Sequence, residues 1–244
     1  MTGNPTLNQN TFTQFSAARG SEAMTVGGTV QKTAILLGLV ILSASYTWDL
    51  YFTKSGASMS GWAMGGALGG FAIAMVTIFK KTWSPFTAPL YAICEGLFIG
   101  AISAIMEAQY HIVIQAVLLT FGTLAALLGA YQTGLIRASE PFKRGVIAAT
   151  GGIAIAYFIS FILGFFHIQV PFINGSGALG IAFSVVVVIV AALNLVIDFD
   201  FIEQGAKVGA PKYMEWYASF SLLVTLVWLY LEILRLLAKI NRRN

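Results

Sequence analysis

Long, uninterrupted runs of apolar residues, separated by short polar segments, make up nearly all of the chain after residue 31. A helix crosses the hydrocarbon core of a bilayer with about 20 residues. Seven runs reach this length, and the continuity of their apolar positions argues against the alternating strands of a barrel. We therefore predict seven transmembrane helices in an all-α integral membrane protein. They are Thr33–Phe52, Gly61–Phe79, Phe86–Met106, Ile112–Gln132, Gly145–Phe166, Gly177–Ile197 and Glu215–Leu237.

The composition agrees with this pattern. The chain is 57% hydrophobic and 10% charged, with a mean hydropathy of +0.80, whereas a soluble domain carries about 25% charged residues. Residues 1–31 are rich in Thr, Asn, Gln, Ser and Gly, and we predict a disordered polar tail there. Residues 32–244 then form a single seven-helix domain. The net charge of +4 comes from basic residues spread between the runs, so nucleic-acid binding is not predicted.

The lysines and arginines indicate an orientation. With the N-terminus in the cytoplasm, the outer loops hold only Lys54, as the positive-inside rule requires. The basic residues after the seventh run then lie outside, against that rule; they are Arg235, Lys239, Arg242 and Arg243. Either the early helices set the topology or the last helix does not cross fully, and we predict seven spans.

Carboxylates within the apolar runs are the candidate functional residues, because an ionisable side chain in hydrocarbon is costly unless it is used or neutralised. Glu95 lies roughly 15 Å below the inner surface by helical rise, and no basic residue shares its run. It is either a protonated acid bonded to a helix backbone or a proton or cation site. Glu232 is followed by Arg235 at a spacing that allows an ion pair along one helix.

Asp198 and Asp200 lie near the inner end of the sixth run. Asp198 follows three apolar residues and is the more buried of the two by this criterion. Asp200 fits a solvated helix end equally well. Burial of Asp198 would raise its pKa and a nearby cation would lower it, so this residue could titrate near neutral pH.

Four motifs are similar to those of one family: YLEILRLL at Tyr230–Leu237, EGLFIGAIS at Glu95–Ser103, KKTWSPFTAP at Lys80–Pro89 and APKYMEWY at Ala210–Tyr217. With the seven-span plan, they resemble the Bax inhibitor-1 (transmembrane Bax inhibitor motif) family, in its bacterial branch. The resemblance implies a bundle in which the last helix is central and wrapped by the other six. It also implies a pH-governed, calcium-permeable leak in the bacterial inner membrane, with the N-terminus in the cytoplasm.

In that family, an acidic pair joins helix six to helix seven and senses protons. The resemblance places its first member at Asp198, with Asp200 as the other choice, and its second member at Glu232. Two features depart from the family. Gly61–Phe79 contains no basic residue, although family members can carry an arginine there. Asp198 and Glu232 are also far apart along the chain for facing residues of antiparallel helices. We therefore hypothesise an inner acidic site of Glu95 and Asp198, with Glu232 as a second site.

These considerations lead us to expect a leak channel gated by protonation of intramembrane carboxylates. Its partners are the lipid bilayer, protons and calcium, which passes through and binds transiently at Asp198 and Glu232 but is not a resident cofactor. A non-conducting regulator of another membrane protein, such as a membrane protease, is one alternative, and a proton-coupled transporter is another. An enzyme is not predicted, because a zinc hydrolase needs about three protein ligands and the only histidines are His111 and His167.

Overall fold

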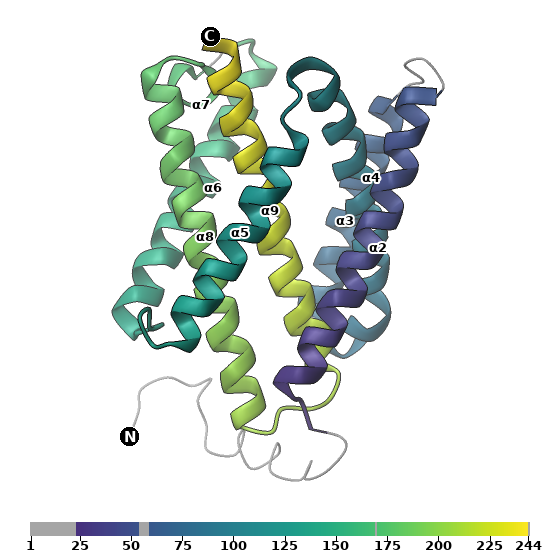
Figure 1. Cartoon of the computed structure of the whole chain (residues 1–244), viewed down its shortest axis with the longest axis vertical. Helices are drawn as coiled ribbons and strands as arrows, with labels where there is room; N and C mark the ends of the chain where they lie inside the picture. Colours follow the sequence, from purple (N-terminus) through teal and green to yellow (C-terminus); the bar gives the residue numbers. More distant parts are fainter. Residues whose placement is uncertain (1–22, 54–58, 169, 244) are drawn as a thin grey trace. The chain divides into compact units, whose positions relative to one another are not determined.

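The computed structural model describes residues 23–53, 59–168 and 170–243. These residues form a chain of helices (Figure 1). In order, the helices are α2 (Val26–Thr53), α3 (Met59–Phe79), η1 (Lys81–Trp83), α4 (Ser84–Tyr110), α5 (Val113–Gln132), α6 (Glu140–Phe165), α7 (Pro171–Asn174), α8 (Ala178–Lys207) and α9 (Met214–Arg243). Within the described residues, seven of the helices are long and apolar enough to cross a membrane. The predicted all-α class and the seven spans are thereby confirmed.

Several helices run beyond the apolar stretches that predicted them. The first begins at Val26 rather than Thr33, so residues 26–31 are helical and do not belong to a disordered tail. Residues 1–22 of the predicted tail lie outside the described residues. The sixth span continues to Lys207, which places Asp198 and Asp200 inside α8 rather than at its end. Hydropathy marks only the part of a helix that needs hydrocarbon, whereas backbone hydrogen bonding continues into the polar interface.

The end of α8 is set by Gly209. Its φ of +65° is a left-handed conformation that glycine adopts without steric cost. The amide of Ala210 donates to the carbonyl of Gly205 at 3.0 Å, and the amide of Gly209 donates to that of Ala206 at 3.2 Å. This pair of bonds is the Schellman arrangement, which satisfies the last carbonyls of a helix and reverses the chain. The reversal brings the chain to the start of α9.

The helices divide into two compact units. One contains Met1–Ala101 with Asp200–Leu223, and the other contains Ile102–Phe199 with Val224–Asn244. We call them unit 1 and unit 2. Helices α4, α8 and α9 each contribute residues to both units. The central position of the last helix, implied by the resemblance, stays a prediction.

Glycines bring the helices of unit 1 close together. A Cβ atom added at Gly66 of α3 would lie 2.6 Å from the carbonyl oxygen of Cys94 on α4. On another part of α4, one added at Gly100 would lie 2.6 Å from the Cα of Ala44 on α2. Helix α4 therefore has glycine contacts with both α2 and α3, which run alongside it (Figure 1). Close backbone approach through small residues is the usual way in which helices pack in lipid.

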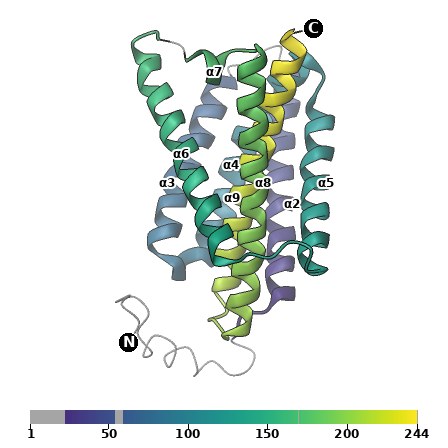
Figure 2. The same cartoon turned by 90° about the vertical axis from the view of Figure 1, so that its left-hand side faces the viewer.

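In unit 2, α6, α8 and the C-terminal half of α9 pack side by side (Figure 2). Their common core consists of Ile153, Val187 and Val190, with Tyr157, Phe183 and Trp228 packed against it. A hydrogen bond of 2.8 Å from the Asn194 amide to the Thr150 hydroxyl also joins α8 to α6. This packing holds Tyr157 of α6 beside α9, where it contributes to the site described below.

Candidate functional site

Glu95 lies on α4 and is partly buried. The hydroxyl group of Tyr91, one turn earlier on the same helix, donates a hydrogen bond to its carboxylate. Gly70 of α3 lies against the same group, since a Cβ atom there would be 3.0 Å from Oε2 of Glu95. Among the residues that the structure describes, no lysine or arginine forms an ion pair with Glu95. It is thus a carboxylate within a membrane span that has a hydroxyl donor but no counter-charge.

Asp198 and Asp200 differ in exposure, as the sequence predicts. Asp198 is 7% exposed, whereas Asp200 is only partly buried. The boundary between the two units falls between them, with Asp198 in unit 2 and Asp200 in unit 1. The hypothesised pairing of Glu95 with Asp198 would join the two units, so it stays a prediction.

Glu232 is 2% exposed and sits among three donors in unit 2. Nη1 of Arg235, three residues later on α9, lies 2.9 and 3.0 Å from its two carboxylate oxygens. The hydroxyl of Tyr157 on α6 lies 3.0 and 2.9 Å from the same oxygens, and Nε1 of Trp228 donates at 3.3 Å. The ion pair along one helix that the sequence allowed is therefore present. The family's pairing of Asp198 with Glu232 stays a prediction.

Arg235 also binds Tyr157 directly. Its Nη1 donates to the tyrosine hydroxyl at 2.6 Å, and its guanidinium group lies 4.9 Å from the centre of the tyrosine ring. Arg235, Tyr157 and Glu232 thus form a closed triangle between α6 and α9. The predicted second span lacks a basic residue, and here the counter-charge for the carboxylate comes from α9 itself.

A second buried glutamate on α9 was not predicted. Glu215 is 0% exposed and accepts hydrogen bonds from both the amide and the hydroxyl of Thr25, each at 2.9 Å. It forms ion pairs with Lys32 and, at 2.8 Å, with Lys212. Gly28 lies so close to the carboxylate that any side chain there would collide with it. Glu215 therefore fixes the start of α2 to the start of α9 in unit 1.

Only one of the partners of Glu215 is recognisable from the sequence. Lys212 precedes it by one helical turn, which is a recognisable local pair. The other partners, Thr25 and Lys32, are separated from it by 190 and 183 residues, and only the fold brings them together. Glu215 consequently looked like a polar residue at the beginning of the seventh span.

The basic residues near the end of α9 are engaged in unit 2. Lys239 is 6% exposed. Its ammonium group donates to the carbonyl oxygens of Ile173 and Gly180 at 2.7 and 3.0 Å and to the hydroxyl of Ser184 at 2.8 Å. Arg242 donates to the hydroxyl of Tyr110 at 2.5 Å. Together with the Arg235 triangle, these contacts give Arg235, Lys239 and Arg242 each a polar partner near the end of α9.

No metal centre is formed by the described parts of the chain: they contain no group of three or more His, Cys, Asp or Glu side chains that could hold an ion. His111 and His167 instead end α4 and α6, each in a left-handed backbone conformation with φ of 53° and 58°. The expectation that the protein is not an enzyme stays a prediction.

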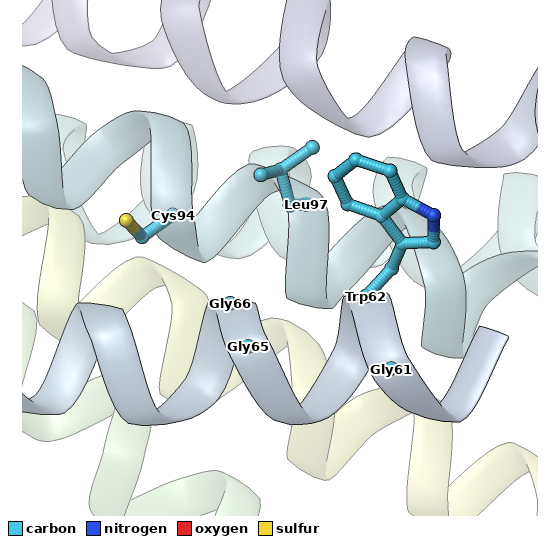
Figure 3. Close-up of a pocket in the computed structure, with 6 residues that line it drawn as sticks. All are labelled: Gly61, Trp62, Gly65, Gly66, Cys94 and Leu97. Atoms are coloured by element: carbon cyan, nitrogen blue, oxygen red, sulfur yellow. The ribbon is translucent and has the colours of Figure 1, made fainter.

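A groove of about 510 Å³ lies between α3 and α4 in unit 1. Its lining residues are Gly61, Trp62, Gly65, Gly66, Cys94 and Leu97. The glycines line the α3 side and face Cys94 and Leu97 of α4, and the Trp62 ring stands beside Leu97 (Figure 3). None of the lining side chains carries a charge, so the groove is suited to apolar groups rather than to ions.

Comparison with known families matches residues 4–242 to the family described as Bax inhibitor 1 like. Searches of curated proteins and of solved structures found no match.

Proposed function

The chain belongs to the Bax inhibitor 1 like family, and on this premise we propose that it is a pH-sensitive, calcium-permeable leak channel. Its place is the bacterial inner membrane, with the N-terminus in the cytoplasm. The observation that carries the proposal is Glu95: a partly buried carboxylate in an apolar span, with Tyr91 as its donor and no cation paired with it among the described residues. Such a residue in a membrane span is a strong candidate for proton or cation handling.

Protonation of Glu95 removes a charge from the interior of the bundle and favours a closed, dry arrangement. Its loss of a proton leaves a negative charge in surroundings of low dielectric constant, where an uncompensated charge is costly. Water or a cation that reaches the carboxylate relieves this cost, so deprotonation favours an open, hydrated path. Carboxylate oxygens are also the ligands that calcium prefers. Flux should therefore rise as the pH rises through the titration of this group.

The other acidic residues have different parts in the proposal. Asp198, buried in α8, is the second titrating group, and Asp200 receives or releases the ion nearer the helix end. Glu232 is already balanced by Arg235, so it acts as a latch between α6 and α9. Calcium binds only transiently at Asp198 and Glu232.

Calcium flux into vesicles tests the proposal. The purified chain is reconstituted into liposomes that hold a calcium-sensitive dye. The initial rate of calcium entry is measured from about pH 5 to about pH 8, which covers about two units below and one unit above neutrality. The wild type should conduct more at high pH, and Glu95→Gln should flatten this dependence because glutamine cannot titrate. A wild type that conducts no calcium at any pH would contradict the leak.

A non-conducting regulator of another membrane protein is the second candidate, and the groove beside α3 favours it. Cβ atoms added at Gly61 and Gly65 would meet nothing within 4 Å, so a partner helix could approach this surface closely.

A proton-coupled transporter is distinguished in the same vesicles by a pH-sensitive dye. Proton movement that requires a cosubstrate would favour the transporter, and the absence of any flux would favour the regulator.

A further inference from the structure

Three lysines from three segments contact the first turn of α9 in unit 1, and a fourth, Lys80, precedes one of them in the chain. Lys32 comes from α2, Lys80 and Lys81 follow α3, and Lys212 lies in the turn before α9. The sequence separates these residues widely, so their basic character looked dispersed. The fold gathers them at the end of unit 1 where α3 ends and where α2, α4 and α9 begin.

The side chains of this turn hold the lysines individually. Nζ of Lys81 lies 5.2 Å from the ring centre of Tyr217, and Nζ of Lys32 lies 5.6 Å from that of Trp216. Lys212 pairs with Glu215 at 2.8 Å. A lysine over an aromatic face is attracted by the negative face of the ring. The amino groups of Lys32, Lys81 and Lys212 are therefore each in contact with a residue of this turn.

A hydrogen bond next to the lysine pair that follows α3 joins this segment to the turn. The hydroxyl of Ser84, a buried residue, donates to the carbonyl oxygen of Tyr213 at 3.0 Å. Ser84 begins α4 and directly follows η1, which starts at Lys81. This contact joins the start of α4 to the segment before α9, so the backbone that carries Lys80 and Lys81 lies close to the backbone that carries Lys212.

The charge of the cluster is strongly positive. Its carboxylate, Glu215, is fully buried and already shared between Lys32 and Lys212, so four lysines and one glutamate leave a formal charge of +3. Nearby, Glu203 of α8 pairs with Lys207 at 2.6 Å, and Asp200 precedes it on the same helix. Lys80 and Lys81 are exposed, and 46% of the Lys212 side chain is exposed. The side chains of these three lysines are thus accessible to an outside ligand, and that of Lys212 is at the same time paired with Glu215.

We propose that Lys80, Lys81 and Lys212 form a binding site for the phosphate group of an anionic phospholipid. The site lies where membrane spans end, which is the depth of lipid headgroups, and Trp83 beside it is 56% exposed, as befits an interfacial residue. Lysine is a point charge suited to phosphate, and basic residues at a membrane surface are attracted to anionic lipids. A zwitterionic lipid carries its own cation and should bind much less.

Native mass spectrometry of the full chain in detergent tests this site. The bound lipids are counted during titration with dioleoyl phosphatidylglycerol or with dioleoyl phosphatidylcholine. The wild type should prefer the anionic lipid by roughly tenfold, as several surface lysines predict. The double variant Lys80→Ala with Lys81→Ala should lose this preference, and Lys80→Arg with Lys81→Arg should keep it because the charge remains.

Two controls make the result decisive. Arg137→Ala with Arg144→Ala removes the same charge from unit 2 and should leave the preference unchanged; an equal loss would mean general attraction without a site. Inorganic phosphate is added in a parallel titration. If it competes at equal concentration with the lipid, the ligand is a soluble phosphate and the lipid assignment is wrong. Thermal melting of each variant verifies that the fold is retained, and a folded lysine variant with wild-type preference would overturn the proposal.

Discussion

Helix α9 carries two buried glutamates that are neutralised in different ways. Glu215, in unit 1, accepts a hydrogen bond from Thr25 and forms ion pairs with Lys32 and Lys212. Lys212 is close to it along the chain, whereas the other two partners lie at the start of α2. Glu232, in unit 2, takes an arginine from its own helix and a tyrosine from α6. Both glutamates are almost fully buried. The contacts of Glu215 mainly join residues that are distant in sequence, whereas the ion pair of Glu232 lies within one helix.

This difference matters because helices in a membrane form before they associate. The pair of Glu232 with Arg235 spans less than one turn and can persist in a separate helix. The pair of Glu215 with Lys32 exists only when α2 and α9 are packed together. Of the two glutamates, Glu215 should therefore contribute more to the stability of the packed state. Glu95, for which the described residues supply a tyrosine donor but no paired cation, should contribute least, and it is the carboxylate to which we assign the proposed gating.

The largest expected effect is that of Glu215→Gln. This change leaves Lys32, which is mostly buried, without its counter-charge, and breaking a buried pair in this way costs about 3–5 kcal/mol. The free energy of unfolding, measured in mixed micelles of a mild and a denaturing detergent, should fall by this amount. Glu203→Gln is the matched control, because it breaks the exposed pair with Lys207 and should cost less than about 1 kcal/mol. Equal losses in the two variants would show that the ion pairs of Glu215 do not stabilise the packing of α2 against α9.

A smaller effect is expected from Arg235→Ala. The variant leaves the Glu232 carboxylate with Tyr157 and Trp228 as donors. We expect a loss of about 1–2 kcal/mol, because the local pair is also present in the separate helix and its removal therefore raises the free energy of both states. The measurement is the same unfolding assay. Tyr157→Phe, which removes the contact between helices but keeps the local pair, should cost about 1 kcal/mol. If Arg235→Ala destabilises as much as Glu215→Gln, the distinction between local and long-range neutralisation fails.

The sequence predicted the architecture better than the polar contacts between the helices. Seven spans follow from hydropathy because lipid demands apolar length, and Val26 and Lys207 show where that criterion stops short of the helix ends. Glu95 was recognised because an acid in an apolar run is conspicuous, and the Glu232–Arg235 pair because its spacing is local. Lys32 as the partner of Glu215 could not be recognised, since the contact depends on how α2 packs against α9.

The smallest structural change with a functional consequence is Gly70→Ala. The added methyl group would lie 3.0 Å from Oε2 of Glu95, so the carboxylate must shift by a few tenths of an ångström or leave the Tyr91 hydroxyl. Its contact with apolar surface would increase, which disfavours the charged form, and the pH at half-maximal calcium flux should rise by roughly half a unit, as a partial loss of one hydrogen bond predicts.

Gly65→Ala on the same helix is the matched control, because its methyl group would meet nothing within 4 Å and should leave the flux profile unchanged. Stability should change by less than about 1 kcal/mol in both variants. A Gly70→Ala profile identical to that of Gly65→Ala would separate Glu95 from gating, and the carboxylate without a counter-charge would then have no functional role in the comparison with Glu215 and Glu232.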